Sequence, residues 1–67
     1  MRGEILELLK ADPFQPFVIR LAGGESYTVR FPGLATVMKD IIYVMDSESD
    51  SHSVLRLVQI TALDIME

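Results

Sequence analysis

The stretch FVIRLAGGESYTVRFPG, residues 17–33, decides the fold because a double glycine separates two alternating segments. In the first segment Phe17, Ile19 and Leu21 recur at every second position, which is the period of a half-buried β-strand. Residues 26–31 alternate in the same way. The sequence therefore predicts a β-hairpin that turns at Gly23-Gly24.

The apolar pattern does not fit a two-residue turn at the double glycine. Such a turn would pair Leu21 with Ser26 and set an apolar face beside a polar one. Pairing Leu21 with Tyr27 keeps the apolar face continuous, but it needs a loop of odd length or a bulge. We therefore expect a positive φ within residues 22–26, at Gly24, and we expect Leu21 and Tyr27 on one face.

Before the hairpin, residues 2–11 have the spacing of a short amphipathic helix, with Ile5, Leu8 and Leu9 on one face. An isolated helix of this length is marginal in water, so its apolar face should pack on the rest of the chain. The helix is expected within residues 1–12, because the residue before Pro13 is disfavoured in the α region. Residues 13–16 form a connector with PxxP spacing, which indicates either a stiff linker or a polyproline ligand.

After the hairpin, Pro32-Gly33 predicts a sharp bend, around which residues 34–38 can continue the second strand. Three more strands are expected; they cover residues 41–45, 54–60 and 62–66, with an acidic, serine-rich loop at 46–53. The strands at 41–45 and 54–60 are largely apolar on both faces. The predicted fold is mainly β: a short N-terminal helix, then a five-stranded, strongly bent antiparallel barrel over 17–67, in one domain over 1–67.

The sequence gives no constellation for catalysis, a cofactor or a metal. It contains no cysteine and a single histidine, so nucleophilic and thiolate or histidine metal sites lack their usual residues. The loop at 46–52 has acidic residues at alternate positions, but it lacks the glycine and the final glutamate of a calcium loop. We therefore expect a protein that is not an enzyme. The aromatic residues are expected in the core rather than as a base-stacking platform; they are Phe17, Tyr27, Phe31 and Tyr43.

Composition narrows the classes further. The formal net charge is −4, whereas nucleic-acid-binding domains usually have an excess of lysine and arginine. No apolar run reaches the roughly 18 residues of a membrane span, and the start lacks the pattern of a signal peptide. The expected location is the cytoplasm.

The order of elements resembles the Sm-like barrel, the fold of Sm, LSm and Hfq proteins, which is related to SH3-like barrels. The segment FVIRLAGGESYTV is similar to the family's opening, with Leu21, Gly24, Tyr27 and Val29 at the matching positions. VMKDIIYVMD resembles the turn into the third strand, and LRLVQITALDIM the last two strands. The resemblance implies a strongly bent five-stranded barrel and a habit of forming rings.

The residues that contact RNA in that family are missing. The turn at 38–42 contains Asp40 but no asparagine, and Gln59-Ile60-Thr61 replaces the basic motif before the last strand. One hypothesis is therefore a non-catalytic, self-assembling barrel that binds protein or a small ligand. The alternative is an RNA binder with an atypical site, whose candidate contacts are Arg20, Arg30, Lys39 and Arg56.

Self-assembly is expected on energetic grounds. Below about 70–80 residues a single core rarely supplies more than about 3–5 kcal/mol, and this chain has no disulfide. An exposed second apolar face on an open strand edge is usually avoided by monomers. We expect a homo-oligomer, a ring or a dimer, paired along residues 54–66. The candidate edge residues are Val54, Arg56, Val58, Ile60, Leu63 and Ile65.

Overall fold

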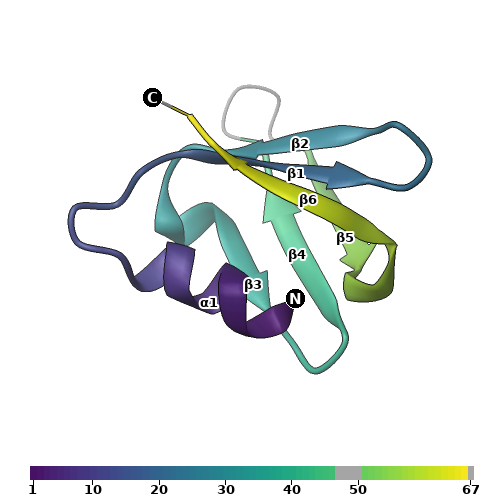
Figure 1. Ribbon diagram of the computed structural model, residues 1–67, viewed down its shortest axis with the longest axis horizontal. Coiled ribbons are helices and arrows are strands. Elements are labelled where there is room, and N and C mark those ends of the chain that lie inside the picture. The colour runs from purple at the N-terminus through teal and green to yellow at the C-terminus, as the bar shows by residue number, and fades with distance from the viewer. Residues whose placement is uncertain (47–50, 67) are drawn as a thin grey trace.

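The computed structural model describes residues 1–46 and 51–66 and contains one helix and six strands (Figure 1). The elements are α1 (Arg2–Lys10), β1 (Phe17–Leu21), β2 (Ser26–Val29), β3 (Ala35–Val37), β4 (Ile41–Met45), β5 (His52–Arg56) and β6 (Ile60–Ile65), with 3-10 turns η1 (Pro32–Leu34) and η2 (Leu57–Gln59). They form two antiparallel sheets with strand orders β2-β1-β6 and β3-β4-β5. Most of the loop that was compared with a calcium loop, residues 47–50, lies outside the described residues.

The hairpin of β1 and β2 confirms the odd-length loop. Gly24 has a φ of 94°, and the N–H of Leu21 donates to the carbonyl oxygen of Glu25 at 2.9 Å. The three-residue loop therefore combines a tight turn with one left-handed glycine, the usual three-residue solution. Ile19 pairs with Tyr27, so Leu21 and Tyr27 share a face as predicted. The predicted direct pairing of Leu21 with Tyr27 is wrong by two residues.

The bend after β2 separates two strands. Pro32–Leu34 forms the turn η1, and β3 then pairs with β4 in the other sheet. The chain consequently has six strands where five were expected. The two sheets do not join into a closed barrel, which corrects the predicted barrel. The physical reason is that the 3-10 turn ends the β2 ladder, so residues 26–37 do not run as one bent strand.

The predicted strand over 54–60 is also corrected. β5 begins earlier, at His52, and ends at Arg56; η2 follows, and β6 begins at Ile60. The turn explains the two-sided apolar pattern, because Leu55, Leu57 and Ile60 are buried while Val58 is 87% exposed. The apolar residues of this segment thus face the core from three different elements.

The core lies between the two sheets, and α1 covers one open side of it beside β3 (Figure 1). Its fully buried side chains are Phe17, Ile5, Ile19, Ile42 and Val29. Leu8 and Leu9 of the helix and Phe14 of the connector pack against this core. The prediction that the helix is docked is confirmed. Phe31 is 60% exposed, so its predicted place in the core is wrong.

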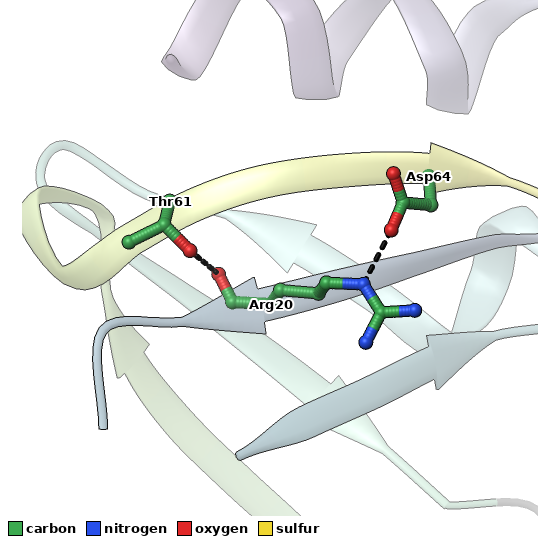
Figure 2. Close-up of polar contacts among 3 residues, drawn as sticks. All are labelled: Arg20, Thr61 and Asp64. Carbon is green, nitrogen blue, oxygen red and sulfur yellow. Dashed lines mark hydrogen bonds and ion pairs between the residues drawn. The ribbon is translucent and has the colours of Figure 1, made fainter. Parts of the chain in front are cut away.

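Polar contacts fix β6 to β1 on the outer face of their sheet (Figure 2). Arg20 of β1 forms an ion pair with Asp64 of β6 through its Nε atom. The register shifts between Arg20 and Leu21, and at this bulge the hydroxyl of Thr61 donates to the carbonyl oxygen of Arg20 at 3.2 Å. The ion pair is half exposed, so its contribution to stability is below about 1 kcal/mol.

Candidate functional site

The outer edge of β5 is an open strand edge. Along an antiparallel ladder, hydrogen-bonded residue pairs alternate with pairs that are not hydrogen-bonded. Two bonds at the ends of the β4–β5 ladder show which pairs are hydrogen-bonded, and this alternation is called the phase of the ladder. Leu57 N–H donates to the carbonyl oxygen of Asp40 at 3.0 Å, and Asp46 N–H donates to that of Ser51 at 2.8 Å. With the register of β4 and β5, this phase turns the backbone groups of His52, Val54 and Arg56 away from β4. The side chain of Val54 is 57% exposed on the same edge.

The outer edge of β6 is open in the same way. Met66 N–H donates to the carbonyl oxygen of Pro16 at 2.8 Å, and the register then points the backbone groups of Leu63 and Ile65 away from β1. A groove of about 390 Å³ runs between this edge and α1. Its lining is mostly apolar with two carboxylates: Met1, Glu4, Glu7, Leu8, Leu63 and Ile65.

The structure divides the residues predicted as one assembly edge between the two sheets. Val54 and Arg56 lie on β5, whereas Ile60, Leu63 and Ile65 lie on β6. Val58 lies in η2, outside both ladders. Ile60 is buried and belongs to the core. Val54 and Arg56 therefore mark one edge, and Leu63 and Ile65 mark another.

The four basic residues proposed as RNA contacts come from four separate places in the chain. Arg20 lies on β1 and is paired with Asp64. Arg30 follows β2, Lys39 lies in the turn between β3 and β4, and Arg56 ends β5. All four are exposed. Arg20 thus already has a carboxylate partner on the surface.

A second groove, of about 350 Å³, lies where β2 and the end of β4 diverge. It is lined by residues of β2, η1, β4 and β5, which are Ser26, Tyr27, Thr28, Arg30, Leu34, Val44, Met45, Asp46, Ser51, His52 and Ser53. His52 stacks on Tyr43 beside it, with ring centroids 5.1 Å apart. Sequence reasoning missed this groove, because it depends on how the two sheets separate and no motif announces it.

Within residues 1–46 and 51–66, no group of three or more histidine or acidic side chains could hold a metal ion. The same part of the chain contains no helix with the length and apolar character needed to cross a membrane.

No protein-family model matches this chain, and no curated protein or solved structure is significantly similar to it.

Proposed function

We propose that the protein is a non-catalytic, self-assembling module of the Sm-like type, which binds protein or a small ligand and assembles through its β5 and β6 edges. The observation that carries this proposal is that each sheet leaves an edge strand open, with exposed apolar side chains on it. Edges of this kind template pairing with another chain unless they are blunted. A cytoplasmic location stays a prediction.

The two edges fit each other in an antiparallel ladder. On β5, the backbone groups of His52, Val54 and Arg56 point outward. On β6, those of Leu63 and Ile65 do. Hydrogen-bonded partners across a ladder have their side chains on the same face. Pairing β5 with β6 of a second copy would therefore bring Val54 beside Leu63 or Ile65, at the groove along α1.

Charge also favours this combination. Arg56 lies two positions from Val54, on the same face and edge of β5. The groove along α1 presents Glu4 and Glu7. A pairing of β5 with β6 would place the guanidinium near these carboxylates, whereas the outward residues of β5, which are His52, Val54 and Arg56, include no carboxylate. The unlike pairing is head-to-tail, so repetition of the contact gives a ring where the rotation between copies closes.

Native mass spectrometry and light scattering test the proposal, with variants that block one edge. The N–H of Val54 points away from β4, so Val54→Pro should spare the β4–β5 ladder and remove an outward donor. Ile65→Pro should do the same on β6. Each is expected to dissociate the assembly, and Val54→Thr, which keeps the N–H, should not.

A wild-type mass corresponding to the 7.5 kDa monomer across micromolar concentrations would overturn the proposal. So would an assembly that survives both proline variants. A test of unfolding by circular dichroism separates dissociation from loss of the fold.

A further inference from the structure

The groove between β2 and β4 has an open strand edge as one wall. The bond from Leu21 N–H to the carbonyl oxygen of Glu25 sets the phase of the β1–β2 ladder. Ile19–Tyr27 and Phe17–Val29 are then hydrogen-bonded pairs, and the backbone groups of Ser26 and Thr28 point away from β1. No strand in the described part of the chain pairs with that side of β2. These outward N–H and carbonyl groups of Ser26 and Thr28 lie along the groove.

The opposite wall is formed by the end of β4, beyond the last residue that pairs with β3. β3 pairs with β4 only as far as Val44, which lies opposite Ala35. One residue further, Met45 still belongs to β4, but the chain on the β3 side has become the 3-10 turn that ends at Leu34. The two sheets diverge at this point, which is why the barrel stays open here.

Among the residues that the structure describes, no charge or proline within β2 and no further strand protects its outer edge against pairing. Natural edge strands are blunted by charges, by proline or by a covering element. β2 has the sequence SYTV, with no charge and no proline, and three of its residues favour strands.

We infer that this groove binds an extended segment of a partner polypeptide, which adds to β2 as a further strand. Addition of a strand to a sheet edge takes affinity from main-chain hydrogen bonds and specificity from alternate side chains. The partner residues that bond to Ser26 and Thr28 have their side chains on the outer face of the sheet, beside the side chains of Ser26 and Thr28. The partner residue opposite Tyr27 points inward, toward Leu34 and Val44, so an apolar side chain is required there.

A second copy of this chain does not fit the groove as well as a free segment does. The groove has walls on both sides, β2 on one and the ends of β4 and β5 on the other. A free extended segment brings only itself to the β2 edge, whereas a strand that is already part of another sheet brings its neighbours with it. This inference supplies a ligand class for the binding part of the proposed function, and it holds whether or not the chain self-assembles.

Selection of a phage-displayed heptapeptide library on the intact wild-type protein tests the inference. Selected peptides should share apolar residues at alternate positions. A synthetic peptide of the selected sequence should alter the amide resonances of Ser26, Thr28 and Met45 in NMR spectra of the protein and should bind with measurable affinity in calorimetry.

Two variants and one control locate the binding. Thr28→Pro removes an outward N–H without touching the bonds to β1, and it should weaken the peptide about tenfold or more. Thr28→Val keeps that N–H and should bind within about twofold of the wild type. Met45→Glu puts a charge on the opposite wall at an already exposed position and should also weaken binding, so the test does not depend on the proline variant folding.

The inference is overturned if no peptide is selected, or if Thr28→Pro and Met45→Glu, both folded, bind as the wild type does. It is also overturned if Thr28→Pro lowers the native mass, because a second copy then occupies the edge. Failure here is distinguishable from failure of the assembly proposal, because Val54→Pro should change the native mass and leave peptide affinity unaltered.

Discussion

Gly24 is the residue on which the hairpin depends most directly. Its φ of 94° lies in the left-handed region, which costs an L-residue with a Cβ roughly 1–2 kcal/mol. Gly24→Ala should therefore lower the free energy of unfolding by about 1–2 kcal/mol, as measured by urea denaturation. A Cβ at Gly24 would meet nothing within 4 Å, so the loss should come from backbone strain alone.

Gly33→Ala is the matched control for that measurement. A Cβ there also meets nothing within 4 Å, and Gly33 has no positive φ. Its free energy of unfolding should stay within about 0.5 kcal/mol of the wild type. Equal effects of the two substitutions would show that the left-handed conformation is not needed.

The sequence predicted that the hairpin loop has an odd number of residues, but it did not predict the exact strand register. Any odd loop keeps Leu21 and Tyr27 on one face, so the apolar alternation cannot distinguish a three-residue loop from a five-residue loop. The structure uses the shorter one, because a single left-handed glycine already closes the turn. The longer loop would have lost the bond from Leu21 N–H to the carbonyl oxygen of Glu25.

At the scale of elements, α1 is held by one fully buried side chain. Ile5 has no exposed surface, while Leu8 and Leu9 are only partly covered. Removing a single methylene from a buried isoleucine costs about 0.5–1.5 kcal/mol. Ile5→Val should lower the free energy of unfolding by that amount in urea denaturation.

The control on the exposed side of the helix is Lys10→Arg, which keeps the charge at an exposed position and should change stability by less than about 0.5 kcal/mol. A stability of Ile5→Val indistinguishable from the wild type would show that the helix is not docked in solution. The sequence pattern predicted the docking, but it could not rank Ile5 above Leu9, because helical spacing shows which residues share a face and not how deeply each one enters the core.

The turn η2 is the element that the sequence did not predict. Leu57-Val58-Gln59 contains none of the glycine, proline, asparagine, aspartate or serine residues that usually mark turns. Apolar residues run through it without interruption, so the segment was interpreted as one strand. The consequence for the candidate site was direct, because the single predicted edge became the two edges of β5 and β6.

At the scale of the whole molecule, charge argues against RNA as the principal partner. The formal net charge is −4, and Arg20 is already paired with Asp64. We predict that single-stranded RNA oligonucleotides bind weakly and lose that binding steeply as salt is raised, because phosphate contacts release counterions. Fluorescence anisotropy over a salt series measures this, with an unrelated acidic domain of similar size as the control.

Submicromolar, sequence-selective RNA binding at physiological salt would contradict that prediction and favour the atypical RNA site. In that case Arg30→Gln and Lys39→Gln should weaken the binding, whereas Asp64→Asn, which frees Arg20, should strengthen it.

The ladder between β1 and β6 has a consequence for how the protein is made. It joins residues as far apart in sequence as Arg20 and Asp64, which are 44 positions apart, and β1 is the central strand of its sheet. During synthesis, β1 and β2 can pair soon after they emerge, but the third strand of that sheet is not available until residues 60–65 have left the ribosome. Such non-local pairing slows folding, and the nascent chain meanwhile exposes both edges of a two-stranded ribbon. The sheet therefore becomes complete only after β6 has emerged, and the interval before that is when the nascent chain is most exposed to chaperones and to aggregation.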